Sequence, residues 1–249
     1  MNRTLLIAAA AVLVAVSLTA CSGSAKTAAS SAASTTAAAT SAGSTTSTSS
    51  SPTTAATSAQ LAALVLQASE VPTGYTGTPY QASPTDAADH AAFAACAGVP
   101  DSAPHQVAEV HSADFAKGNA SISSQATSFA SQSDVDSDVS ALTGSKAQSC
   151  FKSLLTAQVK SGLPAGTTVG DLQVAVTPGP RGGPANLVAF ATAKVTVTRG
   201  GTSTPVYVDA AFLKGPQIEA EVDFQNVGAE FDSTIGQALV EKVAARVAG

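Results

Sequence analysis

The sequence predicts an α+β fold in which a curved antiparallel sheet of about five or six strands is backed by helices, with one disulfide bond. Two observations lead to this prediction. Runs of alternating apolar and polar residues are joined by short turns, which is typical of antiparallel neighbours. Segments with apolar residues at helical spacing come before, between and after those runs, so helices are expected to cover at least one face of the sheet.

The composition of the 249 residues changes sharply along the chain and divides it into three segments. In residues 1–20, the basic residue Arg3 precedes an apolar run over 5–18, which is shorter than the roughly 20 residues that span a bilayer. A secretory signal peptide is therefore predicted. Residues 21–58 are almost entirely Ser, Thr, Ala and Gly, which predicts a disordered tether whose hydroxyl groups permit O-glycosylation. Residues 59–249 are predicted to form a single extracytoplasmic α+β domain.

The leader ends in Leu18-Thr19-Ala20-Cys21, which resembles the bacterial lipobox. The resemblance implies that a diacylglycerol is attached to the Cys21 thiol, that cleavage falls before Cys21, and that an acyl chain such as palmitate is added to the new amine. Several acyl chains hold a protein stably on a membrane, where a single chain gives only marginal binding. The implied location is the outer face of the cell membrane, in the cell envelope. An ordinary signal peptide with an incidental cysteine is the alternative.

In the first half of the domain, the pattern of apolar residues predicts three helices and two strands. They are expected in this order: helices over 61–66 and 84–95, strands over 107–115 and 121–129, and a long helix that starts after Ser133 and ends before Gly162. Ser133 is suited to cap the long helix, and three acids lie in its first turn, where the helix dipole favours negative charge. Gly144 is a candidate break in this helix.

The second half of the domain is mostly strand and ends in a helix. The strands are expected over 172–176, 187–198, 206–212 and 218–224, and the terminal helix over 232–247. Gly200-Gly201 is a two-residue hairpin signal between two of these strands. In the last strand Glu219, Glu221 and Asp223 alternate with apolar residues, which predicts one solvated face.

Cys96 and Cys150 both lie on predicted helices of the exported domain, where disulfides are permitted. With Cys21 consumed by lipid, these two cysteines remain, and a Cys96–Cys150 bond is predicted. Closing a loop of about 55 residues would stabilise the fold by roughly 4 kcal/mol on the chain-entropy model. Two free buried thiols and a redox pair are the alternatives, and the C-x-x-C spacing of a redox pair is absent.

Sequence motifs for catalysis are not found in this chain. No G-x-S-x-G, H-E-x-x-H or P-loop pattern occurs, so we expect no enzymatic activity and no cofactor. His90, with Asp86 four residues earlier, is a candidate general base, although a surface pair of this kind often arises by chance. The loop over 178–184 is a candidate anion cradle. Its prolines lack amide donors, so a mobile hairpin loop is the simpler interpretation.

Two groups of residues are candidates for metal binding, and neither completes a ligand set. His105, Glu109 and His111 lie close together in the sequence, but no fourth zinc ligand stands at a usual spacing. The acids at 134, 136 and 138 resemble the start of a calcium loop, but Val139 and Ser145 stand where an EF-hand needs Gly and Glu. No metal site is therefore predicted.

The sequence also bears on the partners of the domain. Leu187, Ala189, Ala191 and Ala193 form a face of small residues on one predicted strand. Such a face either leaves a cavity for an apolar ligand or lets a helix pack close, and the second interpretation is favoured because Ala is frequent throughout the chain. A net charge of −5 argues against a nucleic-acid partner, since binding of phosphates needs a basic surface.

Several stretches resemble the small exported lipoproteins of mycobacteria and related actinobacteria. These stretches are the lipobox, the tether, residues 70–75 (EVPTGY), 94–100 (AACAGVP) and 111–115 (HSADF), and the later Cys150. The layout is similar to the extracellular sensor domain of mycobacterial serine/threonine kinases and to Mog1/PsbP-like lipoproteins. These resemblances cover most of residues 60–249 and imply a helix-backed antiparallel sheet with a disulfide and no catalytic residues. The kinase sensor has more cysteines than this chain, so its disulfide pattern carries over only in part.

The leading hypothesis is a lipid-anchored extracytoplasmic binding or sensor-like domain without catalytic activity. The membrane is one expected partner, through the lipid on Cys21, and a cell-envelope protein or an apolar small molecule is another. The first alternative is a carrier that holds a lipid or other apolar ligand in a cavity between sheet and helices. The second alternative is a hydrolase whose Ser, His and Asp come together only in the folded chain.

Overall fold

The computed structural model describes residues 55–82, 86–161, 163–180 and 183–249, except the side chains at 86, 87 and 161. The predicted signal peptide, Cys21 and the tether up to residue 54 lie outside the described residues. Within the described residues, no helix is both long enough and apolar enough to cross a membrane.

The described residues contain nine strands, which pair antiparallel in one sheet. The strands are β1 (Thr76–Thr78), β2 (Gln106–His111), β3 (Asp114–Lys117), β4 (Ala120–Phe129), β5 (Thr167–Val169), β6 (Gln173–Pro178), β7 (Leu187–Arg199), β8 (Thr202–Gly215) and β9 (Ile218–Val227). The order across the sheet is β1-β3-β4-β9-β8-β7-β5, with β2 also paired to β4 and β6 also paired to β7. The predicted antiparallel sheet is confirmed.

The nine strands form a sheet that is seven strands across, because two strands lie end to end on each side of it. β2 and β3 follow one another along the same side of β4, and β5 and β6 likewise share one side of β7. The strand expected over 107–115 is broken at Ser112. The Oγ of Ser112 accepts a hydrogen bond from the Ser124 amide at 2.9 Å, which replaces a backbone contact of the ladder.

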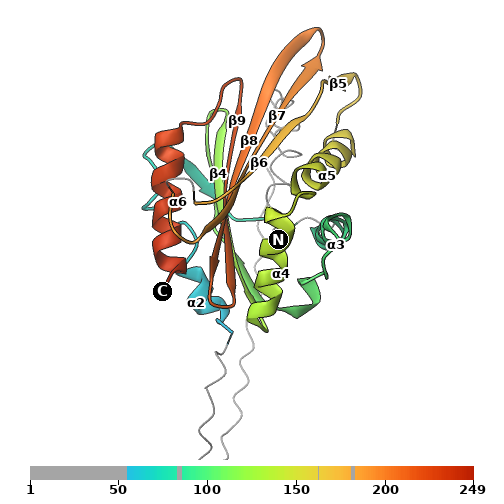
Figure 1. Ribbon diagram of the computed structural model, residues 1–249. Coiled ribbons are helices and arrows are strands. Elements are labelled where there is room, and N and C mark those ends of the chain that lie inside the picture. The colour runs from blue at the N-terminus through green and yellow to red at the C-terminus, as the bar shows by residue number, and fades with distance from the viewer. Residues whose placement is uncertain (1–54, 83–85, 162, 181–182) are drawn as a thin grey trace, which may run out of the picture.

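The described residues form five α-helices and one 3-10 helix. The helices are α2 (Ser58–Ala62), α3 (Asp86–Ala97), α4 (Gln132–Thr143), α5 (Ala147–Ser161) and α6 (Ser233–Val247), and the 3-10 helix is η1 (Ala103–His105). Figure 1 shows α2 and α6 on one face of the sheet and α3, α4 and α5 on the other. The expected break at Gly144 is confirmed, because that residue is extended and separates α4 from α5.

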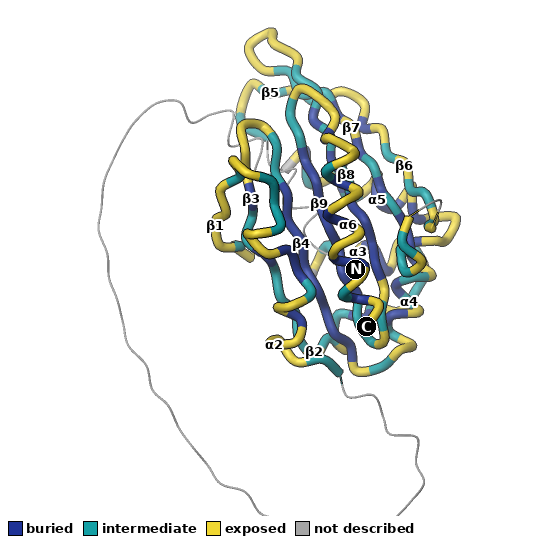
Figure 2. The backbone as a smooth tube through the Cα atoms, turned by 90° about the vertical axis from the view of Figure 1, so that its left-hand side faces the viewer, coloured by how far each residue is buried: buried dark blue, intermediate teal, exposed yellow. Residues whose placement is uncertain are grey.

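Each face of the sheet has its own apolar core. On the α6 side, Leu61 of α2 and Leu239 of α6 belong to one cluster with Ile122 and Phe224 of the sheet. On the opposite side, Phe151 and Leu155 of α5 pack with Phe212 and the alanines of β7. Successive side chains of a strand point to opposite faces, so the long strands supply both cores at once. Figure 2 shows that the central strands β4, β8 and β9 are largely buried.

The small residues of β7 let the helix layer pack close to the sheet, which confirms the favoured interpretation of that face. Ala189 and Ala191 are buried in the cluster that contains Phe151 and Leu155. Leu187 does not share this face as expected. The register shifts between Leu187 and Ala189, and this bulge turns Leu187 toward the core on the α6 side.

The prediction of a solvated face on β9 is wrong. Glu219, Glu221 and Asp223 are all buried, because β9 lies in the middle of the sheet and contacts α4 as well as α6. Gln125 of β4 donates from Nε2 to Glu221 Oε2 at 3.2 Å. Burial raises the pKa of Glu219 and Asp223 to about 7, and burial together with the Asp223 charge raises the pKa of Glu221 well above its ordinary value. A void of about 10 Å³ beside this row holds at most one water.

The predicted disulfide is present. It joins Cys96 at the end of α3 to Cys150 in α5, across a sequence separation of 54 residues. Phe93 of α3 lies against Phe151 of α5, with ring centroids 4.7 Å apart. In Figure 1, α3 lies at the outside of the helix layer. The disulfide therefore ties the outermost helix to one that contacts the sheet.

Candidate functional site

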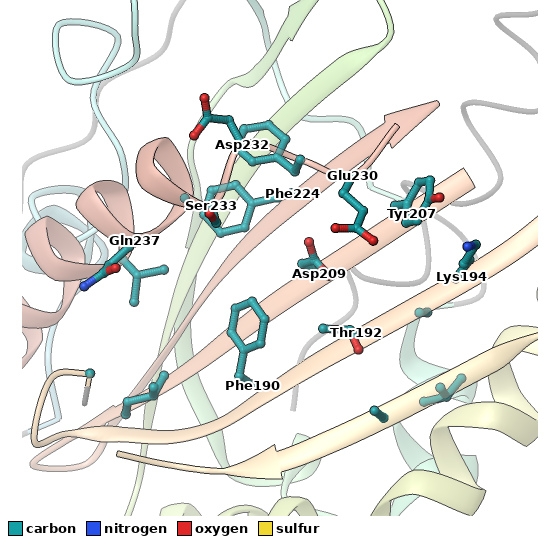
Figure 3. Close-up of a pocket in the computed structure, with 18 of the residues that line it drawn as sticks. Phe190, Thr192, Lys194, Tyr207, Asp209, Phe224, Glu230, Asp232, Ser233 and Gln237 are labelled. Atoms are coloured by element: carbon teal, nitrogen blue, oxygen red, sulfur yellow. The ribbon is translucent and has the colours of Figure 1, made fainter. Parts of the chain in front are cut away.

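A pocket of about 640 Å³ lies between the sheet and α6, on the face opposite to α3, α4 and α5 (Figure 3). Strands β6, β7, β8 and β9 form its floor, α6 forms a wall, and the loops before β7 and before α6 form its rim. The pocket exists because α6 packs mainly over β8 and β9, so the same face of β6 and β7 stays open. The volume falls in the range of about 300–1,000 Å³ that is typical of small-molecule sites.

The strand register arranges the floor in three rows. The rows are Lys194–Tyr207, Thr192–Asp209–Phe224 and Phe190–Ala211. Neighbours within a row are paired across β7, β8 and β9, and successive rows lie two residues apart along each strand. All of these side chains therefore point to the same face of the sheet. Asp209 lies at the centre of the floor.

The wall is one stripe of α6. Four of its residues line the pocket at helical spacing: Ser233, Gly236, Gln237 and Val240. Gly236 brings the helix near the floor, because a Cβ at this position would lie 3.8 Å from the rings of Phe224 and Phe231. These two rings pack together, with centroids 4.9 Å apart. The base of the pocket between floor and wall is consequently apolar and aromatic.

Two carboxyl groups come together at the mouth of the pocket. Figure 3 shows Glu230, on the loop before α6, pointing toward Asp209 on the floor. No hydrogen bond or ion pair from another described residue reaches the Asp209 carboxyl. Burial, and then the negative charge of Glu230, raise the pKa of Asp209 from 3.8 to about 6. Near neutral pH the Asp209 carboxyl is therefore mostly ionised, and among the described residues no cation lies between it and Glu230.

The other charged side chains of the described lining are already engaged. Lys194 Nζ lies over the ring of Tyr207, 5.1 Å from its centroid, which is a cation–π distance. Asp232 caps α6, and its Oδ1 accepts hydrogen bonds from the amides of Thr234 and Ile235 at 2.9 and 3.2 Å. The charged groups of the described lining that have no partner are thus the carboxyls of Asp209 and Glu230, so the unpaired charge of the pocket is negative.

The sequence offers a cavity at the alanine face of β7 as one interpretation, whereas the pocket lies on the other face of that strand. The residues that alternate with those alanines, Phe190, Thr192 and Lys194, form the floor. Asp209 belongs to none of the sequence motifs described above. A single carboxylate inside the apolar strand over 206–213 was the signal that could have identified it.

His90, the candidate base, is buried and connects α3 to η1 and α4. Its Nδ1 lies 2.5 Å from Asp101 Oδ1, and its Nε2 lies 3.9 Å from Asp138 Oδ2. Ser102 donates from Oγ to the same Asp138 oxygen at 2.5 Å. The side chain of Asp86, the expected partner, lies outside the described residues. The fold thus brings a serine, a histidine and two aspartates together.

The connections within this cluster differ from those of a nucleophilic triad. A triad needs the serine hydroxyl bonded to the imidazole, and the acid bonded to the opposite ring nitrogen. Here Ser102 donates to a carboxylate instead, and it is only 2% exposed. Burial acts to raise the pKa of Asp138, but the nearby His90 and the hydrogen bond from Ser102 act in the opposite direction, and the pKa is lowered. This cluster fastens three helical segments together.

The candidate zinc ligands pair separately. His105 Nδ1 lies 2.6 Å from Asp134 Oδ1, while His111 Nε2 lies 2.7 Å from Glu109 Oε1. The ring of His111 also stacks on Tyr80, with centroids 3.6 Å apart. Among the described residues, no group of three or more His, Cys, Asp or Glu side chains is arranged to hold a metal ion.

The candidate calcium-binding acids also serve different contacts. Asp134 accepts a hydrogen bond from Ser131, and Asp136 accepts one from Gln132. Asp138 belongs to the His90 cluster. Side-chain contacts account for these acids, and Asp134 also lies in the first turn of α4.

The candidate anion cradle uses its described amides internally. Gly179 donates to the Val188 carbonyl at 2.8 Å, and Gly183 donates to the Pro180 carbonyl at 3.1 Å. Residues 181 and 182 lie outside the described part of the loop. Gly183 and Pro184 instead contribute to the rim of the pocket.

No known family model and no curated protein matches the chain. Among solved structures, the chain is similar to the extracellular domain of PknH from Mycobacterium tuberculosis. The TM-score is 0.42 and the sequence identity is 14%, over 78% of this chain and 97% of that one. The likeness is weak and concerns architecture.

Proposed function

We propose that the protein is a lipid-anchored extracytoplasmic domain that binds a small apolar or amphiphilic ligand without changing it chemically. The pocket beside α6 carries this proposal. It combines an aromatic base with a few polar groups at its mouth, which is the general character of ligand sites. The lipobox at Cys21 supports the anchor and the location on the outer face of the cell membrane.

Binding without catalysis is proposed in place of a hydrolase built from Ser, His and Asp. The described lining of the pocket contains no histidine or cysteine that could act as a base or nucleophile beside a ligand. The buried Ser102–Asp138 contact involves residues that do not line the pocket. The geometry therefore favours binding over the hydrolase alternative.

A carrier of apolar molecules is the second candidate, and the apolar base of the pocket favours it. Leu187, Phe190, Phe231 and Val240 offer a surface for an alkyl chain or ring. Native mass spectrometry of the purified chain separates the two candidates. A lipid retained through purification indicates a carrier, whereas an empty protein that binds added ligand indicates a receptor. The measurement uses the Cys21→Ser variant, so that an acyl chain attached to the protein is not mistaken for a bound lipid.

Filling the pocket tests whether binding occurs there. Thr192→Trp places an indole on the floor, and Thr196→Trp places the same group on the same face of β7 but outside the lining. With N-phenyl-1-naphthylamine as a neutral fluorescent probe, Thr192→Trp is expected to weaken binding at least about tenfold, equivalent to 1.4 kcal/mol. Thr196→Trp is expected to bind like the parent chain. Equal binding by both variants, or none by the parent, would contradict the proposal.

A further inference from the structure

We infer that the pocket selects a ligand that carries a positively charged ammonium group on an apolar body, an inference that rests on the proposed function of the pocket. Asp209 and Glu230 hold the ammonium group at the mouth. The apolar body lies along the aromatic base between the floor and α6 (Figure 3).

Asp209 has no counter-charge among the residues that the structure describes. This carboxyl lies at the centre of the floor, between Thr192 and Phe224 in its row, and no described donor or cation contacts it. A partly buried carboxylate without a partner is unfavourable, and a second carboxylate, Glu230, adds repulsion. An ammonium group placed between the two carboxylates removes both costs at once.

Aromatic rings surround Asp209. Phe224 lies beside it in the same row and Phe190 lies on the next row of the floor, while Tyr207, on the other neighbouring row, already holds Lys194 over its ring. Aromatic faces together with carboxylates form the chemistry by which proteins recognise ammonium groups, because the ring faces are electrostatically negative. A neutral ligand would use the rings but would leave both carboxylates unpaired.

Among the described residues, the other charges that face Asp209 belong to Lys194 on β7, Glu230 on the loop, and Asp232 at the start of α6. Lys194 is held over Tyr207, and Asp232 is engaged as the cap of α6. An anionic ligand would therefore meet two free carboxylates at the mouth and one lysine away from its centre. The charge of the site disfavours such a ligand.

The ammonium group could belong to a soluble hydrophobic amine or to the headgroup of an aminolipid. Both sources present the same chemistry to Asp209 and Glu230. They differ in whether the apolar body is extracted from a bilayer, and uptake from vesicles distinguishes them.

The test compares three ligands with the same alkyl chain and different heads: decylammonium, decanol and decanoate. Calorimetry with the Cys21→Ser chain at pH 7.5 is expected to give decylammonium an affinity about tenfold above that of decanol, with decanoate the weakest. Asp209→Asn combined with Glu230→Gln is expected to reduce the affinity for decylammonium to that for decanol. Asp136→Asn removes a charge from α4, on the other face of the sheet, and is expected to change nothing.

Two further measurements keep the inference testable if the double variant folds poorly. Lys194→Met removes the positive charge from the lining and is expected to leave decylammonium binding intact or to strengthen it. In the parent chain, affinity for decylammonium is expected to rise severalfold between pH 5 and pH 7.5, because Asp209 ionises in this interval. Decanol is expected to show no such rise.

The outcomes separate the inference from the proposed function. Equal affinity for all three ligands, unchanged by the double variant and by pH, overturns charge selection and leaves an apolar binding pocket. Binding of none of them overturns the proposed function as well. Where decylammonium is selected, uptake of phosphatidylethanolamine from vesicles identifies a lipid headgroup, and failure of uptake identifies a soluble amine.

Discussion

At the scale of single residues, Asp209 is expected to reduce the stability of the empty protein at neutral pH. Its pKa is raised to about 6 in the folded state, so the folded protein binds this proton more tightly than the unfolded chain does. The resulting stability is complete below the ordinary pKa of 3.8 and is lost as the pH rises through 6. Asp209→Asn is therefore expected to raise the free energy of unfolding by about 1 kcal/mol at pH 7.5, after allowance for solvent screening.

Urea denaturation at pH 4 and pH 7.5 measures this effect. The gain from Asp209→Asn should shrink toward zero at the lower pH, while the exposed loop variant Asp171→Asn should show the same difference from the parent at both. A gain that is independent of pH would mean that the amide improves packing and that the carboxylate is not the cause.

Residues of the site could be grouped from the sequence only where they lie on the same strand. The polar residues Thr192 and Lys194 alternate with alanines in the sequence, so their common face could be inferred. That this face lies open depends on where α6 packs, some 40 residues later in the chain. Asp209 and Glu230 lie on different elements, and their approach follows from the tertiary structure alone.

At the scale of elements, α6 packs on the sheet beside two glycines, Gly236 and Gly215. An added Cβ is tolerated at the first and clashes at the second. At Gly236 an added Cβ would make ordinary contacts of 3.8 Å with Phe224 and Phe231, so Gly236→Ala is expected to raise stability by about 1 kcal/mol through helix propensity. At Gly215 the added Cβ would lie 2.3 Å from the Val247 carbonyl oxygen at the end of α6. Gly215→Ala is expected to lower stability by about 1–3 kcal/mol.

Thermal and urea unfolding of the two alanine variants, compared with the parent, measure these changes. Each variant thus serves as the control for the other, because both replace glycine with alanine, one near the start of α6 and one against its end. Stabilisation at both positions would show that α6 does not pack against the β8–β9 turn as closely as the structure places it.

The elements that the sequence predicts well are those with long, regular patterns. Strands β4, β7, β8 and β9 alternate over many residues, and α6 repeats apolar residues through four turns. The three-residue strands β1 and β5 are too short to show a period, and they are stabilised by pairing with β3 and β7. The break at Ser112 and the bulge after Leu187 depend on partners distant in sequence, which no local pattern contains.

At the scale of the whole molecule, the sheet separates two functions. The face toward α3, α4 and α5 carries the disulfide, the His90 cluster and the close alanine packing. The face toward α6 carries the pocket. Because the two helix layers contact different sides of the sheet, a change in one layer should affect global stability without changing the geometry of the pocket (Figure 1).

The disulfide tests this separation. Cys96→Ser with Cys150→Ala opens a loop of 54 residues and is expected to lower the free energy of unfolding by about 4 kcal/mol. Hydrogen exchange should accelerate most in α3, because that helix packs chiefly against α5 and is held there by the bond. Affinity of the pocket for N-phenyl-1-naphthylamine should stay within about twofold of the parent value under conditions where both proteins are folded. A large loss of affinity would show instead that the helix layer sets the curvature of β6 and β7, and that the pocket depends on both faces of the sheet.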